Sequence, residues 1–295
     1  MKNICSLITV YNPDTQKLKR NIEKILEYSE AVYLLFNSPV IERLLFDGRI
    51  FAVDNGKNIG ISRAINKGIN KAAQDGYCHA LLFDQDSYMT AVQCVKLFDE
   101  IAAEEQRQKV ACIGPSINSH GNTIPIPAWS KNTVAIHTEN VVSVNNIITS
   151  GMLINIPAFF DIGGFPENFP VDFSDFLFCW KAVYRGYTVL QSTDAFIIHE
   201  IGTNCIKIFG HTIHFHAPYR NYFLVRDTLN ICFRAKETPL YIRFRYFFFL
   251  SFRMLLFLVM LDQKWARLKM YWLGIVDFFM GKSHFGSIDK ILGAK

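Results

Sequence analysis

Two carboxylates one residue apart directly follow an apolar run in this chain of 295 residues. Asp84 and Asp86 come after Ala80-Leu81-Leu82-Phe83, which is typical of a buried strand that ends in a loop. Carboxylate oxygens at the carboxyl end of a strand suit a divalent cation such as Mg²⁺ or Mn²⁺, which keeps most of its waters and takes further ligands from a diphosphate. The alternative is that the same residues cap a helix that begins near Tyr88.

The elements that must position this pair alternate between strand and helix over the first hundred residues. The pattern predicts strands at residues 4–10, 32–36, 50–53 and 80–83, with helices at 15–30, 60–74 and 90–106. Such parallel β-α-β units bind ligands beyond the carboxyl ends of their strands. The polar loops at 9–13, 37–38, 54–60 and 84–87 are therefore expected to converge. Further strands are predicted at 110–114 and 141–148, and an acidic helix start at 172–175.

Composition limits the class of protein. Half of the residues are apolar, 26 are Phe and 19% are charged, so the chain is neither disordered nor fibrous but could present a surface to lipid. The net charge is +5, and residues 239–290 carry all of this excess, with eight Lys or Arg against three Asp. Seven scattered cysteines without a C-x-x-C pair favour reduced thiols in a cytosolic protein. The apolar run at 4–10 is too short for a secretory signal, so no export is expected.

Two common nucleotide-binding signatures are missing from the sequence. No G-x-G-x-x-G follows the first predicted strand, and no G-x-x-x-x-G-K-[ST] occurs. The sequence therefore lacks the main evidence for a dinucleotide-dependent oxidoreductase or a P-loop NTPase. Phosphates would have to be held in another way.

Short motifs of Gly, Asn and carboxylate residues run through most of the chain. They are Thr9-Val10-Tyr11-Asn12-Pro13, Asn58-x-Gly60-x3-Ala64-x-Asn66-x-Gly68, Asp84-Gln85-Asp86-Ser87, Ser150-Gly151, Gly163-Gly164-Phe165-x-Glu167, Asp172-x2-Asp175 and His199-x2-Gly202. In this order and spacing they resemble family 2 glycosyltransferases over residues 3–230, most of all the bacterial rhamnosyltransferases that build O-antigen and capsule. Residues 274–286 carry a second similarity. Each motif alone is weak, whereas seven in register are specific.

This resemblance implies a GT-A fold, an α/β architecture in which a mixed sheet is flanked by helices. In that fold the first half of the domain binds a nucleotide sugar and the second half binds the acceptor. The resemblance implies that Asp86 and Asp84 hold Mg²⁺ or Mn²⁺, with His199 reaching the metal or the diphosphate. Many relatives carry Asp where this chain has Asn37. The residues implied in binding the nucleotide sugar are Thr9, Tyr11, Asn12, Asn37, Asn58, Arg63, Asp84, Gln85 and Arg220.

Two further carboxylates are implied in catalysis. Asp175 resembles the general base of the family, which removes the proton from the acceptor hydroxyl while C1 of the sugar inverts. Asp172, one helical turn earlier, could contact acceptor hydroxyls or raise the pKa of Asp175 by like-charge proximity. The alternative is an ordinary helix cap. His199 could equally be structural, and the alternating His211, His214 and His216 lack the carboxylate or Cys partners of a metal site.

The segment at 219–227 contains two arginines and resembles a segment of the family. This chain has Asp227 where the family usually has Asn. Arg220 and Arg226 are six residues apart, too far for one helix face, so they are expected to serve different partners. A guanidinium fork matches phosphate oxygens, which favours Arg220 as a diphosphate ligand. Ordinary surface ion pairs are the alternative.

A composition change near residue 237 predicts a boundary there. The resemblance implies a GT-A glycosyltransferase domain at 1–236, and the composition beyond it predicts a basic, aromatic, helical membrane-associating region at 237–295. The apolar run at 246–261 contains Arg253, which disfavours a membrane-spanning helix and favours one lying in the membrane surface. Trp265 and Trp272 with neighbouring Lys and Arg predict a second interfacial element. A buried helix or a homo-oligomer interface is the alternative. Nucleic acid is not an expected partner, because no nucleic-acid-binding signature occurs.

The sequence thus predicts an inverting, metal-dependent glycosyltransferase, peripheral at the cytoplasmic face of the inner or plasma membrane. The resemblance implies transfer of L-rhamnose from dTDP-β-L-rhamnose to a lipid-diphosphate-linked saccharide acceptor in surface polysaccharide synthesis. Alternatives are a UDP-hexose donor, a nucleotidyltransferase that releases pyrophosphate, and a non-catalytic membrane scaffold.

Overall fold

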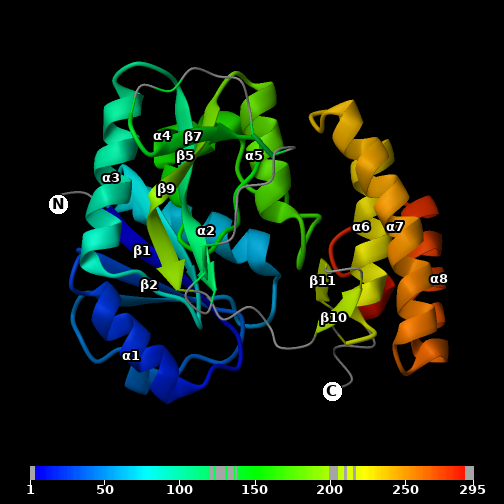
Figure 1. The fold of residues 1–295 in the computed structure, drawn as a ribbon. Helices are drawn as coiled ribbons and strands as arrows, with labels where there is room; N and C mark the ends of the chain where they lie inside the picture. The colour runs from blue at the N-terminus through cyan, green and yellow to red at the C-terminus, as the bar shows by residue number, and fades with distance from the viewer. Residues whose placement is uncertain are drawn as a thin grey trace. The chain divides into compact units, whose positions relative to one another are not determined.

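The computed structural model describes residues 4–119, 122–123, 130–131, 136, 138–198, 205–208, 211–214 and 217–289. The chain forms two compact units (Figure 1). The first comprises Met1–Pro166 and Ser174–Glu200, and the second comprises Glu167–Phe173 and Ile201–Lys295. The predicted division into a glycosyltransferase domain at 1–236 and a membrane-associating region at 237–295 stays a prediction.

A mixed sheet forms the centre of the first unit. The strands are β1 (Ile4–Val10), β2 (Ala31–Phe36), β3 (Ile50–Asp54), β4 (His79–Asp84), β5 (Val110–Ser119), β6 (Asn122–Thr123), β7 (Val141–Val144), β8 (Leu153–Asn155) and β9 (Thr188–Ile198). Their order is β3-β2-β1-β4-β8-β5-β9-β7, with β6 paired to β5. The first four are mutually parallel, as the sequence predicted. In contrast, β8 runs antiparallel to both β4 and β5.

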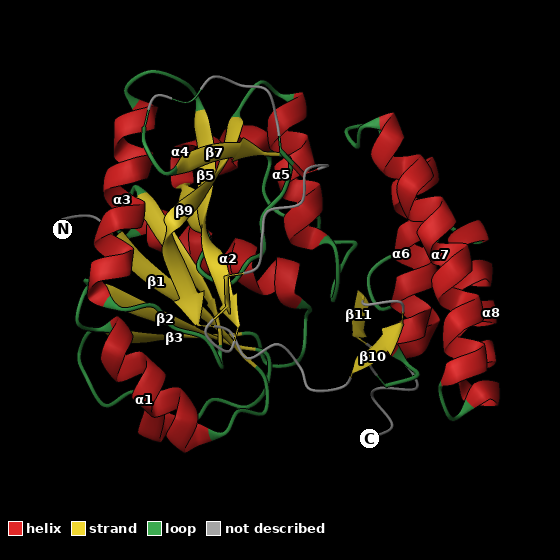
Figure 2. Ribbon diagram, viewed as in Figure 1, coloured by secondary structure: helices red, strands yellow, loops and turns green. Residues whose placement is uncertain are grey.

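Helices cover both faces of this sheet, which gives three layers (Figure 2). The strands alternate apolar side chains between the two faces, so each face can bury a layer of helices. On one face α1 (Thr15–Ile25) and α3 (Ala91–Glu105) bury residues such as Ile22 and Leu97. On the other face α2 (Ile61–Gln74), α4 (Ile156–Ile162) and α5 (Ser174–Tyr184) bury residues such as Ile65, Phe159 and Phe178.

Three predicted elements differ in length from those observed. The helix predicted at 15–30 ends at Ile25, because the chain must turn back to start β2, and Glu30 N–H already donates to Ile4 O at 3.2 Å. The strand predicted at 141–148 ends at Val144, where Asn145 N–H donates to Ser130 O instead, at 2.6 Å. The strand predicted at 110–114 continues to Ser119 because it pairs with β9 through irregularities in register.

The second unit is mainly helical. It contains the antiparallel pair β10 (Cys205–Ile208) and β11 (His211–His214), and the helices α6 (Arg220–Phe233), α7 (Leu240–Met260) and α8 (Lys264–Phe279), with α6 packed against both other helices. The short 3-10 turns η1 (Glu42–Leu44) and η3 (Gly286–Ile288) complete the described elements. Across the ranges given above, no helix has both the length and the apolar character needed to cross a bilayer.

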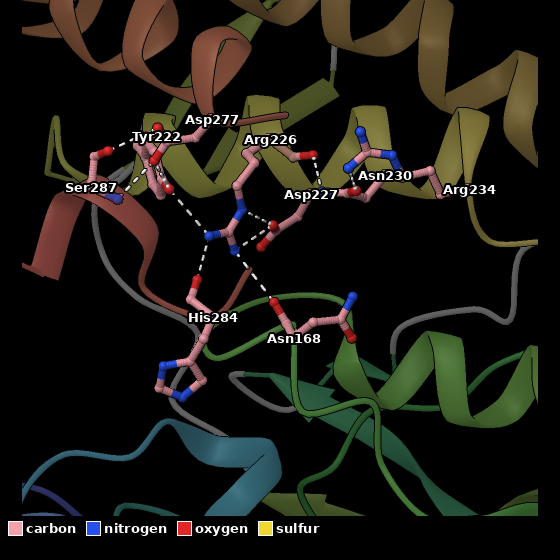
Figure 3. Close-up of polar contacts among 9 residues, drawn as sticks. All are labelled: Asn168, Tyr222, Arg226, Asp227, Asn230, Arg234, Asp277, His284 and Ser287. Atoms are coloured by element: carbon pink, nitrogen blue, oxygen red, sulfur yellow. Dashed lines mark hydrogen bonds and ion pairs between the residues drawn. The ribbon is translucent and has the colours of Figure 1, made fainter. Parts of the chain in front are cut away.

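A buried polar network holds the second unit together (Figure 3). Arg226 and Asp227 are fully buried and form an ion pair with an N–O distance of 2.6 Å. Arg226 also donates to the carbonyl oxygens of His284 and Asn168, the latter at 3.4 Å. The network thus joins α6, the segment Glu167–Phe173 and the turn that follows α8. The prediction that Arg220 and Arg226 serve different partners is confirmed.

That turn approaches the network very closely at Gly286. A Cβ atom there would lie 2.1 Å from the Tyr222 hydroxyl oxygen and 2.8 Å from an Asp277 carboxylate oxygen. The Tyr222 hydroxyl itself donates to Asp277 Oδ2 at 2.7 Å. With φ at +54°, the position also favours glycine in backbone terms.

Candidate active site

The sheet topology brings Ser150 to Asp84, although the two residues are far apart in the sequence. Asp84 ends β4, and the antiparallel β8 starts at the same edge of the sheet, with Leu81 opposite Leu153. The residues that lead into β8 therefore lie beside the end of β4, and Gly151 N–H donates to Leu82 O at 2.7 Å. Ser150 Oγ then donates to Asp84 Oδ2.

Gly151 is required for this approach. Its φ is +78°, and a Cβ atom would lie 2.7 Å from Pro115 Cγ. The Ser150-Gly151 motif therefore supplies one hydrogen-bond donor to Asp84 and the backbone freedom that delivers it.

Asp175 is bound by the residue next to Ser150. Asp175 lies in the first turn of α5, and its Oδ2 accepts from Thr149 N–H at 3.2 Å and from Thr149 Oγ1 at 3.5 Å. Its Oδ1 accepts from Phe176 N–H at 2.8 Å. Asp84 and Asp175 are thus held by adjacent residues, and both carboxylates are only half-buried.

Asp86 occupies the loop after β4. Its carboxylate is exposed, while the neighbouring Ser87 is buried. Ser87 Oγ bonds to both the N–H and the C=O of Asp84, each at 3.1 Å, and fixes the tight turn of the loop. Asp84 and Asp86 are therefore presented on a braced loop at the carboxyl edge of the sheet.

The predicted convergence of the loops is confirmed by hydrogen bonds between them. Tyr11 N–H donates to Gln85 Oε1 at 2.9 Å, which joins the loop after β1 to the loop after β4. Asn12 N–H donates to Ser38 Oγ at 3.3 Å, which joins it to the loop after β2. Asn21 of α1 donates to Gln85 O at 3.2 Å.

Asn37 organises the loop that follows β3. It is buried, and its Oδ1 accepts from Asn55 Nδ2 at 3.2 Å while its Nδ2 donates to Gly60 O at 3.4 Å. An aspartate there could accept but, when ionised, could not donate to a carbonyl. The amide at this position therefore fits the loop around it.

Apart from Arg220, the remaining predicted donor-binding residues belong to the same unit. Thr9 lies one residue before the end of β1, opposite Asp84. Asn58 accepts from Gly60 N–H at 2.9 Å, and Arg63 lies half-buried in the first turn of α2. Thr149 and Asn21 were not predicted, and Ser38 was predicted only as part of the loop at 37–38. Thr149 adjoined a recognised motif, Ser150-Gly151, which could have directed attention to it.

Asp172 and Arg220 belong to the second unit, where Arg220 Nη2 donates to Asp172 Oδ1. The placement of Asp172 one helical turn before Asp175 on the same helix is wrong, because α5 begins at Ser174 and Phe173 has a φ of +69° that no continuous helix contains. The effect of Asp172 on Asp175 and the roles of Arg220 stay predictions. His199 and His216 lie outside the described residues, as do the side chains of His211 and His214.

The carboxylate pair fits a hard divalent cation. Mg²⁺ and Mn²⁺ accept one or two protein carboxylates and fill their remaining positions with water and substrate phosphate oxygens. Asp84 and Asp86 supply that number from one loop. No cluster of three or more His, Cys, Asp or Glu suited to a metal occurs in the part of the chain that the structure describes.

Comparisons with known proteins agree with this architecture. No family model matches the chain. The chain is 27% identical over 253 residues to the dTDP-rhamnosyl transferase RfbF of Shigella flexneri, an alignment that spans 82% of this chain and 84% of RfbF.

Two solved structures share the fold. The mannosyltransferase PcManGT from Pyrobaculum calidifontis, in complex with GDP-Man and Mn²⁺, aligns with a TM-score of 0.57 and 13% identity over 99% of this chain and 79% of its own. GalNAc-T7 with UDP, GalNAc and Mn²⁺ aligns with a TM-score of 0.55 and 12% identity over 91% of this chain, which spans 58% of that protein. By its fold and its sequence likeness to RfbF, the chain is a glycosyltransferase with the GT-A fold.

Proposed function

We propose that this glycosyltransferase is inverting and metal-dependent, and that it transfers L-rhamnose from dTDP-β-L-rhamnose to a lipid-diphosphate-linked saccharide in surface polysaccharide synthesis. The observation that carries the proposal is the arrangement of Asp84 and Asp175 on the adjacent residues Ser150 and Thr149. A donor-binding carboxylate and a proton-accepting carboxylate then belong to one rigid edge of the sheet.

The chemistry follows from the two carboxylates. Asp175 accepts hydrogen bonds from Thr149 and from the Phe176 N–H, so its carboxylate is oriented before the acceptor arrives. The carboxylate takes the proton of the acceptor hydroxyl, whose oxygen attacks C1 of the sugar from the face opposite the leaving group. A single displacement of this kind inverts the configuration at C1 and yields an α-linkage from a β-linked donor.

Asp84 and Asp86 are the residues that would hold the cation, Mg²⁺ or Mn²⁺. When bound, such a cation acts as a Lewis acid that neutralises negative charge on the departing nucleoside diphosphate. Ser150 fixes the orientation of Asp84, and Ser87 fixes the loop that carries both carboxylates.

The rhamnose donor is supported by the likeness to RfbF, which is named as a dTDP-rhamnosyl transferase. The test is a donor panel in which the purified protein is supplied with dTDP-β-L-rhamnose, UDP-glucose, UDP-GlcNAc or GDP-mannose, Mn²⁺ or Mg²⁺, and a lipid-linked acceptor. Release of dTDP with dTDP-β-L-rhamnose at a rate at least tenfold above the others supports the assignment. Equal or faster turnover of a UDP-hexose overturns it, and release of pyrophosphate would instead indicate a nucleotidyltransferase.

We further propose that α7 and α8 attach the enzyme to the cytoplasmic face of the membrane. Helix α7 exposes large apolar side chains along one stripe, at Phe244, Phe248, Phe252, Leu255 and Val259. Phe248 is 69% exposed, and Trp265 at the start of α8 is 85% exposed. So many exposed apolar side chains are unusual on a soluble monomer and are typical of a surface that meets a partner or a lipid.

Basic residues interleave with these apolar groups. Arg245, Lys264 and Lys269 are exposed on the same two helices, where they would attract anionic lipid. We expect the protein to co-sediment with phosphatidylglycerol vesicles and to do so about tenfold less well after Phe248→Ser combined with Trp265→Ser. The matched control is Phe160→Ser on α4, which is 45% exposed but belongs to the first unit. Vesicle-independent dimerisation that these substitutions abolish would instead identify the patch as an interface between copies.

A further inference from the structure

Asn66 binds the backbone of Phe165, although the two residues are 99 positions apart in the sequence. The Asn66 Nδ2 atom donates to Phe165 O at 3.0 Å, and Phe165 N–H donates to Asn66 Oδ1 at 3.0 Å. The amide thus satisfies both backbone groups of Phe165, as a neighbouring strand would do. Asn66 lies in α2 and Phe165 lies in the turn that follows α4, so the two hydrogen bonds tie these segments together.

Two glycines bring the Phe165 backbone to Asn66. Gly163 and Gly164 have φ values of +91° and +68°, which glycine adopts readily. The N–H groups of both glycines donate to Phe159 O, each at 3.0 Å, and close the end of α4. A Cβ atom on Gly164 would lie 3.1 Å from Phe159 Cζ and 3.2 Å from Asn66 Oδ1. A larger residue would therefore crowd the side chain that holds Phe165.

The ring of Phe165 connects this anchored turn to α5. It stacks on the ring of Phe178 with centroids 4.8 Å apart and an interplanar angle of 25°. Both side chains are buried, so neither ring can shift without disturbing a close-packed core. Phe178 lies three residues after Asp175, on the same side of α5. The packing of Phe178 therefore sets the rotation of the helix and with it the position of the Asp175 carboxylate.

Helix α2 is a firm anchor for this arrangement. Gly68 lets the helix approach the sheet closely, because a Cβ atom there would lie 2.6 Å from Leu35 Cδ2 and 2.7 Å from Leu7 Cδ2. Ile65 and Ile69 are buried on the same helix. The backbone of α2 is thus held by the sheet without help from the Asn66 side chain.

We infer that Asn66 is a positioning residue for Asp175. The inference rests on the proposed function, in which Asp175 removes the proton from the acceptor hydroxyl. Asn66 fixes the backbone of Phe165, whose ring holds Phe178. Helix α5 then presents Asp175 to Thr149, whose N–H donates to Asp175 Oδ2 at 3.2 Å. A displacement of about 1 Å at a reacting group can lower a rate about 10²-fold, so a distant anchor can affect turnover.

The first test compares Asn66→Ala with Asn70→Ala in the full-length protein. Asn70 is exposed one turn later on α2, and its side chain donates to Asn66 O at 2.8 Å. We expect Asn66→Ala to lower kcat about tenfold and to change the dissociation constant of the nucleoside diphosphate less than about twofold. Asn70→Ala should change neither quantity by more than about twofold. A general loosening of α2 would weaken nucleotide binding as well, because the helix carries Arg63.

The second test is a double-mutant cycle with Phe178→Leu. Leucine keeps an apolar side chain but loses the ring that stacks on Phe165. Because both residues act along one path, the variant that combines Asn66→Ala with Phe178→Leu should lose little more activity than the worse single variant. Ile101→Val on α3 is a buried substitution on the opposite face of the sheet. It controls for loss of core packing and should leave kcat unchanged.

Hydrogen exchange gives a measurement that does not depend on activity. The N–H groups of Phe165 and Thr149 donate to Asn66 and Asp175, so their exchange rates report both ends of the path. We expect both amides to exchange at least about fivefold faster in Asn66→Ala than in the wild type, and at the wild-type rate in Asn70→Ala. If no nucleotide sugar supports transfer but exchange at Thr149 still depends on Asn66, the positioning stands and the proposed function fails.

Four outcomes would overturn the inference. The first is a folded Asn66→Ala protein with the kcat of the wild type. The second is a loss of nucleotide affinity as large as the loss of kcat. The third is that the losses of the two single variants multiply in the double variant, and the fourth is unchanged exchange at Thr149. A cooperative urea transition establishes that the variants are folded, and Asn66→Ser replaces Asn66→Ala in every comparison if the alanine variant does not fold.

Discussion

Asp84 and Asp175 are 91 positions apart in the sequence, yet they accept hydrogen bonds from the adjacent residues Ser150 and Thr149. This arrangement exists because β8 runs antiparallel to β4, so the segment before β8 passes the carboxyl end of β4. The first residue of that segment binds the carboxylate of α5, and the second binds the carboxylate of β4. The relative position of the two carboxylates is thereby set by one peptide unit.

Asp175→Asn should abolish sugar transfer while leaving the donor bound. The amide cannot take up the proton of the acceptor hydroxyl, and loss of a general base typically costs about 10²–10⁴ in rate. The measurement is turnover of the nucleotide sugar beside its dissociation constant, which should change less than threefold. Asp99→Asn, on the exposed side of α3, is the matched control and should keep full activity. Wild-type turnover in Asp175→Asn would show that another group is the base.

Ser150→Ala should weaken metal binding. The hydroxyl orients Asp84, and loss of such a supporting hydrogen bond typically reduces metal affinity about 10–100-fold. Titration of Mn²⁺ followed by electron paramagnetic resonance measures this in the presence of the nucleoside diphosphate. Ser143→Ala is a matched control, because the Ser143 hydroxyl is buried in β7 and finds no partner among the described residues. If both variants bind Mn²⁺ like the wild type, Asp84 does not depend on Ser150.

Removal of the metal should stop turnover, and readdition of Mn²⁺ or Mg²⁺ should restore it. We expect dialysis against EDTA to lower the rate at least 100-fold, because the charge of the leaving diphosphate would then lack its main counter-charge. Asp86→Asn should reproduce most of that loss at saturating metal. Transfer that continues at the original rate after exhaustive chelation would contradict a role for Asp84 and Asp86 as metal ligands.

The free energy of unfolding of Glu100→Gln, relative to that of the wild type, should increase as the pH rises. Burial raises the pKa of Glu100 to about 7, while Ser192 donates to its Oε1 at 3.1 Å. Between pH 4.5 and 7 the unfolded chain releases this proton and the folded chain keeps it, so wild-type stability falls across that interval. We expect the difference in unfolding free energy between Glu100→Gln and wild type to grow by about 2 kcal/mol from pH 4.5 to pH 8.

Urea titrations across this pH range measure the difference, and exposed Glu23→Gln on α1 is the control that should show no such trend. A difference between Glu100→Gln and wild type that is flat from pH 4.5 to 8 would mean that Glu100 ionises at its ordinary pKa in the folded protein.

Arg226→Met should strongly destabilise the second unit. The substitution leaves Asp227 buried without its counter-charge and removes donors to His284 and Asn168, and breaking a buried ion pair typically costs about 3–5 kcal/mol. Hydrogen exchange of α6 amides reports this unit without relying on global unfolding. Arg234→Met, at the exposed residue that follows α6, should cost less than about 1 kcal/mol. Combining Arg226→Met with Asp227→Leu should recover part of the lost stability. If Arg226→Met destabilises the second unit no more than Arg234→Met does, the buried polar network does not stabilise this unit.

Much of the first unit was predictable because its signals are local. Apolar runs bounded by polar turns identified the four parallel strands, and the end of each run identified the loops that would meet. The helix limits were less predictable, since α1 ends where the chain must return to the sheet and not where its helical pattern ends. The position of Asp172 outside α5 depends on the left-handed backbone at Phe173, which no residue pattern announces.

The sequence by itself determined the residue types at the site, the strands and loops that carry them and the resemblance to glycosyltransferases. Only the tertiary structure decided that Thr149 and Ser150 bind Asp175 and Asp84, that Asp172 pairs with Arg220 and that Arg226 is buried with Asp227. The physical reason is the range of the interactions. Strand, helix and turn preferences act over a few neighbouring residues, whereas hydrogen bonds between distant residues require strand direction, register and packing to be fixed first.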